Sequence, residues 1–209
     1  MSEKLNVVLC WHMHQPWYRE SVDGEYRLPW VYLHALKDYT DMAAHLELHP
    51  KMQCVVNFTP VLIEQINDYA DQCREWLQTG SKFQDPLLNY LSGAKPIPEA
   101  PSKRIKLIEA CLKANATQMI DPFPAYRQLV DMVILDGDQS RINEEVVAYL
   151  NDRFFHDLLT WYHLAWLGYS LRQQECVTSL IEQGRAFSSS QRRQMIELFS
   201  QAFSELLPR

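Results

Sequence analysis

Two short, uninterrupted apolar runs lie near the start of the chain, and a stretch of helical periodicity follows each of them. The runs are Leu5–His14 and Met52–Phe58. Continuous apolar runs of this length are typical of strands that are buried on both faces. Trp30–Leu48 and Thr59–Leu77 place apolar residues three and four positions apart, as amphipathic helices do. We therefore predict a β-α-β-α unit over residues 1–92, with its two strands parallel.

After Gly80 the pattern becomes mainly helical, and no third strand is evident. Three prolines within residues 93–102 predict a rigid connection without helix. Beyond it, residues 102–209 are expected to form a mostly helical segment, with helices over Ser102–Gln118, Pro124–Leu135 (closed by Asp136-Gly137), Asn143–Arg172 (long, or broken near Gly168) and Ser188–Leu206. Ser188 at the start of the last helix is an N-cap signal. The predicted class is α/β with a largely helical second half.

Composition and charge narrow the range of functions. The net charge of the 209 residues is −6, and there is no basic block, which argues against nucleic acid as the main partner. No apolar run approaches the roughly 20 residues of a membrane span, and the start lacks a signal-peptide pattern, so we expect a cytoplasmic protein. The five cysteines are scattered and without a CxxC pair, which predicts reduced, mostly buried thiols.

The strongest chemical signal is His12-Met13-His14-Gln15-Pro16, where the first predicted strand meets a loop. Alternate side chains of a strand share a face, so His12 and His14 are expected to point the same way. Pro16 cannot donate a ladder hydrogen bond and is expected to end the strand. Polar groups at the carboxyl end of a parallel strand are where open sheets and barrels build their sites.

Three interpretations of this motif stay open at the level of the residues alone. His12 and His14 suit a metal such as zinc, although no further cluster with ligand spacing follows. They also suit a core in which both rings are satisfied by hydrogen bonds. The interpretation we favour is hydrogen bonding to a polar substrate, because the Gln15 carboxamide both donates and accepts, as a sugar hydroxyl does.

Other residues are candidates for the same site. Asn57 ends the second predicted strand, where it is either a turn residue or a group that orients the histidines. Trp11, Trp17 and Trp30 lie near the first strand end and are candidates for a surface that stacks on sugar rings. His34 and Asp38 share a helix face and are expected to be a surface or packing pair, with a general base as the alternative. The cluster of Trp161, Tyr162, His163 and Trp166 is expected to pack between helices, with a cleft wall as the alternative.

The motif and its neighbours resemble a known family. In content and order, four segments are similar to the first signature region and the following elements of glycoside hydrolase family 57, in its amylopullulanase-like and α-amylase-like members. These segments are His12-Met13-His14-Gln15-Pro16, Leu28–Tyr39, Val56–Gln65 and Leu158–Leu167, the last resembling a helical insertion. Together they span nearly the whole chain.

The resemblance implies the N-terminal portion of an incomplete (β/α)7, TIM-like barrel over residues 1–209. It implies an α-glucan or maltooligosaccharide substrate, cleaved with retention by hydrolysis or by 4-α-glucanotransferase chemistry, and no cofactor. The substrate-binding residues would be His12, His14, Gln15, Trp17, Trp30, Asn57 and Trp166.

The same resemblance places the nucleophile Glu and the acid Asp on later strands, beyond Arg209. We therefore expect the chain alone to be inactive, with a second polypeptide as a possible partner that completes the barrel. The alternatives are a metal-dependent hydrolase or deacetylase that uses His12 and His14, and a non-catalytic carbohydrate-binding module.

Overall fold

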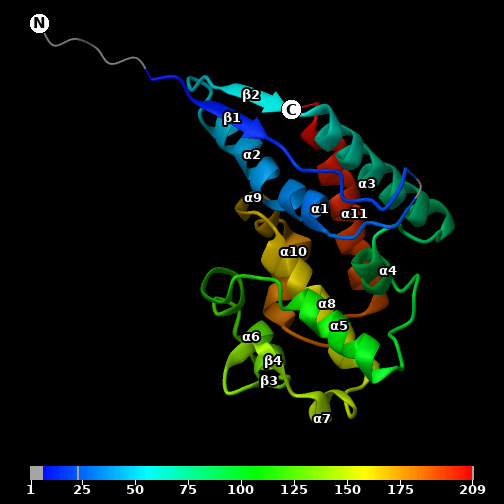
Figure 1. Cartoon of the computed structure of the whole chain (residues 1–209). Helices are drawn as coiled ribbons and strands as arrows, with labels where there is room; N and C mark the ends of the chain where they lie inside the picture. The colour runs from blue at the N-terminus through cyan, green and yellow to red at the C-terminus, as the bar shows by residue number, and fades with distance from the viewer. Residues whose placement is uncertain (1–6, 23, 209) are drawn as a thin grey trace, which may run out of the picture.

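The computed structural model describes residues 7–22 and 24–208 and shows a mixed fold in which helices dominate (Figure 1). The first half contains β1 (Cys10–Met13), α1 (Trp30–His34), the π-helical turn η1 (Ala35–Tyr39), α2 (Thr40–Leu48), β2 (Val55–Phe58), α3 (Pro60–Thr79) and α4 (Pro86–Ser92). The second half contains α5 (Pro101–Cys111), the π-helical turn η2 (Ala116–Ile120), α6 (Pro124–Asp131), β3 (Ile134–Leu135), β4 (Asp138–Ile142), α7 (Glu144–Val147), α8 (Asp152–Trp166), α9 (Tyr169–Arg172), α10 (Glu175–Gln183) and α11 (Ser189–Leu206).

The strands β1 and β2 pair in parallel, as predicted for the two apolar runs. Their register places Cys10 opposite Val55 and His12 opposite Asn57. The two strands therefore end at the same edge, and the polar residues that close each run lie side by side. Of the predicted strand Leu5–His14, Leu5 and Asn6 lie outside the described residues, and residues 7–9 and His14 are not part of β1.

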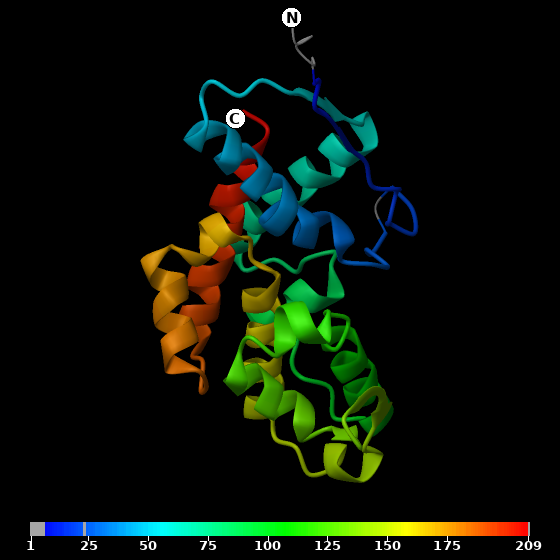
Figure 2. The same ribbon diagram turned by 90° about the vertical axis from the view of Figure 1, so that its left-hand side faces the viewer.

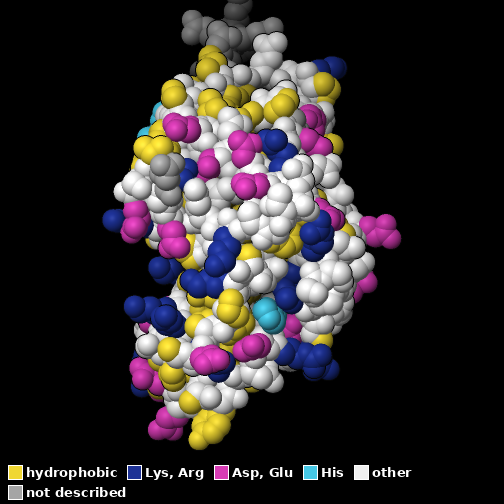
Figure 3. All heavy atoms as spheres, turned by 90° about the vertical axis from the view of Figure 1, so that its right-hand side faces the viewer, with side chains coloured by type: hydrophobic (Ala, Val, Ile, Leu, Met, Phe, Trp, Pro, Cys, Tyr) yellow, Lys and Arg dark blue, Asp and Glu magenta, His cyan; other side chains and the backbone are white. Residues whose placement is uncertain are grey.

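One face of this small sheet is covered and the other is open. Trp11, Met13 and Phe58 face an apolar layer made by α2 and the end of α11, which returns to the sheet near the C-terminus (Figure 1). On the opposite face Cys10 is exposed, and Val55 is 53% exposed. The prediction that β1 is buried on both faces is therefore wrong, because the described helices cover only one side. Figure 3 shows the resulting hydrophobic side chains at the end of the molecule that carries the strands.

The helices form an elongated body in which the sheet and α1–α3 make one end, and α5–α7 with the β3–β4 hairpin make the other (Figures 1 and 2). Helix α8 is almost wholly buried in the interior, and α11 lies along α3. Ser188 and Gln191 form a capping box at the start of α11, as its N-cap signal predicted. The helix predicted over Asn143–Arg172 is broken near Gly168, as one alternative expected, since α8 ends at Trp166 and α9 begins at Tyr169. It is also broken between Val147 and Asp152, where α7 ends and α8 begins, which was not predicted.

Three local predictions are corrected. Asp136 and Gly137 do not close a helix: their φ angles of 54° and 73° form the two-residue turn of the β3–β4 hairpin, which Asp-Gly favours. Helix α5 ends at Cys111, before the predicted Gln118, because Asn115 caps a new turn by accepting from the backbone N–H of Gln118. The third correction is the hairpin itself, since no third strand was expected after Gly80. The helices α4 and α10 were not predicted.

The five cysteines are free, but they are not mostly buried. Cys73 and Cys111 are buried in helical packing, whereas Cys10 and Cys176 are exposed. Cys10 is exposed because it lies on the open face of the sheet. Among the described helices, none has both the length and the apolar composition needed to cross a membrane.

Candidate functional site

The ends of β1 and β2 bring His12, His14 and Asn57 together on the open face of the sheet. His12 Nδ1 lies 2.8 Å from Asn57 Oδ1, and the His12 and His14 rings stack with centroids 6.0 Å apart and planes 8° apart. The Asn57 oxygen only accepts hydrogen bonds, so His12 Nδ1 carries the proton. In the neutral imidazole, His12 Nε2 is then free to accept a hydrogen bond from a ligand hydroxyl. All three residues are exposed to solvent.

Gln15 is held by two tyrosines next to this edge. Its Nε2 donates to the Tyr39 hydroxyl oxygen at 3.3 Å, and its Oε1 accepts from the Tyr18 hydroxyl at 2.9 Å. Burial raises the pKa of both tyrosines, so both hydroxyls stay protonated and act as neutral hydrogen-bonding groups. Gln15 is therefore already oriented, and the carboxamide keeps hydrogen-bonding capacity beyond these two contacts.

A buried residue of α3, Gln65, fixes the loop that follows β1. Its Oε1 accepts from the backbone N–H of Tyr18 at 3.1 Å, while its Nε2 donates to the carbonyl of Pro16 at 3.0 Å. A buried carboxamide that bonds to a loop in this way satisfies backbone groups that have no partner in a strand or helix. Sequence reasoning did not assign Gln65 to the site. The available signal was its position among the apolar residues of an amphipathic helix, where a polar side chain needs a partner.

An aromatic wall, formed by Trp30, His34, Tyr39 and Trp166, adjoins Gln15 through Tyr39. The ring centroids of Trp30 and Trp166 are 5.7 Å apart, and the His34 and Trp166 rings are nearly perpendicular with centroids 5.6 Å apart. Trp166 is 8% exposed and packs against Trp30, and Trp30 is the more exposed of the two residues.

The π-helical turn η1 explains how His34 and Tyr39 reach the same wall. Residues five apart are on different faces of an α-helix, whereas the i→i+5 bonding of a π turn brings them into register. The His34 and Tyr39 rings accordingly lie 6.4 Å apart. The Thr40 hydroxyl donates to the carbonyl of Ala35 at 2.6 Å and satisfies one backbone acceptor inside the turn. Neither the turn nor the role of Tyr39 was predicted.

The carboxylate that joins this wall is Asp38. Its Oδ2 lies 2.5 Å from His34 Nδ1, and Lys37 Nζ lies 3.3 Å from its other oxygen. The hydrogen bond from His34 lowers the pKa of Asp38, so the group is a carboxylate at neutral pH. The Lys37 ammonium also lies 5.7 Å from the Trp166 ring centroid.

The other aromatic candidates lie elsewhere. Trp11 faces the covered side of the sheet and packs against the core, so it is not beside His12 and His14. Trp17 is 37% exposed in the loop after the motif, with the Arg19 guanidinium 5.9 Å from its ring. Of the α8 cluster, Trp161, Tyr162 and His163 belong to the core, as the packing interpretation predicted, and Trp166 alone reaches the aromatic wall. Burial lowers the pKa of His163 to about 4, so this ring is neutral and accepts from the Tyr32 hydroxyl.

The sequence-predicted residues thus fall into one polar edge and one aromatic wall. The polar edge consists of His12, His14, Gln15 and Asn57, and the wall supplies Trp30 and Trp166, with Trp17 separate from both. Among the residues that the structure describes, no group of three or more His, Cys, Asp or Glu side chains is arranged to hold a metal ion.

Comparison with family models gives one match, to the family described as glycosyl hydrolase family 57, over residues 8–207. The match covers nearly the whole chain and includes every residue of the polar edge and the aromatic wall. Comparison with curated proteins and with solved structures gives no significant match.

Proposed function

The chain belongs to glycosyl hydrolase family 57, and from that premise we propose that it supplies the substrate-binding wall of a retaining enzyme that acts on α-glucans. Membership makes the protein a glycoside hydrolase by family, with a carbohydrate as its substrate. The finer assignment, to hydrolysis of an α-glucan or to 4-α-glucanotransfer, follows from the similarity of its motifs to amylopullulanase-like and α-amylase-like members.

The observation that carries this proposal is the junction of the polar edge with the aromatic wall. A glucose ring has hydroxyl groups around its rim and apolar C–H groups on its faces. His12 Nε2, His14 and the Gln15 carboxamide are hydrogen-bonding groups for the rim, and Trp30 is a flat apolar surface for a face. Tyr39 connects the two parts by its contact with Gln15, and we propose that a maltooligosaccharide engages both.

The chemistry of retention requires more than this wall. Two carboxyl groups about 5–5.5 Å apart must flank the scissile bond, one as nucleophile and one as acid. Asp38, the carboxylate of the aromatic wall, is engaged by His34 and Lys37. We assign the nucleophile Glu and the acid Asp to strands outside residues 1–209, and we expect His12 and His14 to stabilise charge that develops on the sugar.

The open face of the sheet supports the same assignment. β1 and β2 expose apolar side chains, and Val55 is 53% exposed. In parallel sheets such side chains are buried because both faces of the sheet are covered. We propose that further parallel strands, on a second polypeptide, extend this sheet into an incomplete (β/α)7 barrel of which residues 1–209 are the N-terminal part. The exposed strand edges would otherwise favour association with other chains.

The test is to measure maltoheptaose binding by calorimetry and reducing-sugar release from soluble starch, using the purified chain without a partner. We expect weak binding that His14→Ala abolishes, and no release of reducing sugar. His49→Ala, at an exposed residue after α2, is the matched control and should bind as the wild type does. Reducing sugar released by the wild-type chain would show that a carboxylate within it does the chemistry, and would overturn the assignment.

A carbohydrate-binding module without catalytic function is the second candidate, because Trp17 is exposed apart from the polar edge. Binding that survives His12→Ala and His14→Ala but fails in Trp17→Ala or Trp30→Ala would favour that function over the barrel wall.

A further inference from the structure

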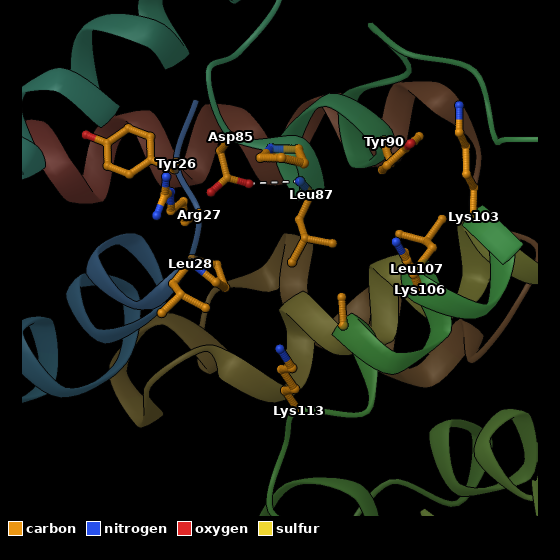
Figure 4. A pocket seen from close by; sticks show the side chains of 13 residues that line it. Tyr26, Arg27, Leu28, Asp85, Leu87, Tyr90, Lys103, Lys106, Leu107 and Lys113 are labelled. Carbon is orange, nitrogen blue, oxygen red and sulfur yellow. Dashed lines mark hydrogen bonds between the residues drawn. The ribbon is translucent and has the colours of Figure 1, made fainter. Parts of the chain in front are cut away.

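A second cavity lies between the segment that leads into α1 and the helices α4 and α5, apart from the polar edge. It has a volume of about 260 Å³ and is walled by apolar groups that include Leu28, Leu87 and Leu107. Arg27, Lys103, Lys106 and Lys113 line its rim. Figure 4 shows Arg27 on one side and Lys103 and Lys106 of α5 on the other, and the amino group of Lys113, two residues past the end of α5, points into the space between them.

The rim is strongly positive although the chain as a whole is acidic, with a net charge of −6. Lys103 and Lys106 lie three residues apart on one side of α5, and Lys113 lies two residues past the end of that helix. In the described part of the chain, none of the three ammonium groups forms an ion pair or a side-chain hydrogen bond. Figure 3 shows Lys and Arg gathered across the middle of that face of the molecule.

Neither Asp85 nor Glu20 forms an ion pair with these lysines. Asp85 in the wall is 1% exposed, and its oxygens accept from the backbone N–H groups of Leu87 and Leu88 and from the Tyr69 hydroxyl. Glu20 pairs with Arg27 at 3.2 Å, but both side chains are more than half exposed, so this pair is weak and exchangeable.

We propose that this cavity binds a small phosphate ester, with the phosphate between Lys106 and Lys113 and the organic ring against the apolar wall. Several unpaired ammonium groups match an anion of more than one charge, and lysine is a common phosphate ligand. The apolar wall would contribute little to a bare phosphate ion, and the cationic rim would contribute little to a neutral sugar. The volume lies just below the range for drug-sized ligands and fits a ligand of nucleotide or sugar-phosphate size.

The cavity is adjacent to the candidate carbohydrate site and is distinct from it. The backbone N–H of Arg27 donates to the carbonyl of Tyr18 at 2.9 Å, and Tyr18 holds Gln15. Pro29 lines the cavity directly before Trp30 begins α1. Binding in the cavity requires no glucan, so it can be tested separately from the proposed function.

The test is calorimetric titration of the purified chain with ADP and with glucose 1-phosphate, which separate a nucleotide ligand from a sugar phosphate. Inorganic phosphate, adenosine and glucose are the probes for charge alone and for the organic part alone. We expect one of the two esters to bind with one-to-one stoichiometry, more tightly than any of these three probes. The affinity should fall as sodium chloride is raised from 0.05 to 0.5 M, because screening weakens exposed charge pairs.

The variant Lys106→Glu/Lys113→Glu should weaken ester binding by about tenfold or more. Lys51→Glu/Lys82→Glu, at exposed lysines away from the cavity, makes the same change in net charge and should bind as the wild type does. Lys106→Gln/Lys113→Gln replaces the first variant if circular dichroism shows that glutamate disturbs α5. The proposal is overturned if neither ester binds, or if the control pair weakens binding as much as the cavity pair.

Discussion

Asp85 links the stability of this fold to pH. It is the N-cap of α4 and is 1% exposed. Oδ1 accepts from the backbone N–H of Leu87 at 2.9 Å, and Oδ2 accepts from the Tyr69 hydroxyl at 2.9 Å. Burial outweighs these hydrogen bonds and raises the pKa of Asp85 from 3.8 to about 6.

The direction of the effect follows from the proton balance. Between the unfolded pKa of 3.8 and the folded pKa of about 6, the unfolded chain has lost the Asp85 proton while the folded chain keeps it. The free energy of unfolding therefore falls as pH rises through this window. At about 1.4 kcal/mol per pKa unit, the loss between pH 4 and pH 7 is about 2–3 kcal/mol. Asp85→Asn keeps an acceptor at the helix cap but removes the ionisation, and so removes this loss.

The assay is urea unfolding of the wild type and of Asp85→Asn at pH 4, 5, 6 and 7, followed by tryptophan fluorescence. The free energy of unfolding of the wild type, minus that of the variant, should decrease by about 2 kcal/mol from pH 4 to pH 7. Asp71→Asn, at an exposed aspartate of α3, is the control for loss of a surface carboxylate. A difference that stays constant, or that grows with pH, would show that the hydrogen bonds outweigh burial and would refute the reasoning.

Three further predictions concern the site and its support. Gly168→Ala should lower the free energy of unfolding, measured in thermal or urea melts, by about 1–3 kcal/mol. The reason is that an added Cβ would lie 2.7 Å from the Asp41 carboxylate, which accepts from the backbone N–H of Tyr169 at the start of α9. An unchanged melt would contradict this packing. Tyr39→Phe loses the contact with Gln15 and should weaken maltoheptaose binding by about three- to tenfold, whereas Tyr149→Phe, at a residue that is 90% exposed, should not. Treatment with EDTA should leave glucan binding unchanged; loss of binding that zinc restores would favour the metal-dependent alternative.

The elements that sequence analysis predicted best are those whose local signals agree with their packing. The helix over Thr59–Leu77 corresponds to α3, because Pro60 starts it and its apolar stripe faces the core. The pairing of β1 with β2 followed from a helical crossover between two apolar runs. The hairpin was missed although Asp136-Gly137 is its usual turn, because β3 has only two residues and follows a helix directly.

The geometry of the candidate site could be predicted only where the alternation of side chains along a strand places residues together. His12, His14 and Asn57 meet because strand period and parallel register fix their face. Tyr39 joins them through a π turn, a departure from helical period that no local pattern in the sequence marks. Gln65 reaches the same loop across 49 residues of chain, and such a contact is set by tertiary packing alone.

The open face of the sheet changes character along the strands, and this constrains the proposed barrel. Toward the strand starts it presents Cys10 and Val55, and toward the ends it presents His12, Asn57 and His14. Covering the first group stabilises the sheet by removing apolar area from water, whereas covering the second would bury hydrogen-bonding groups that a ligand must reach. A layer that completes the barrel must therefore seal the strand starts and stop before His12. In the isolated chain water surrounds both groups, so the histidines bind hydroxyls in competition with solvent, and this is why we expect weak glucan affinity until that layer is present.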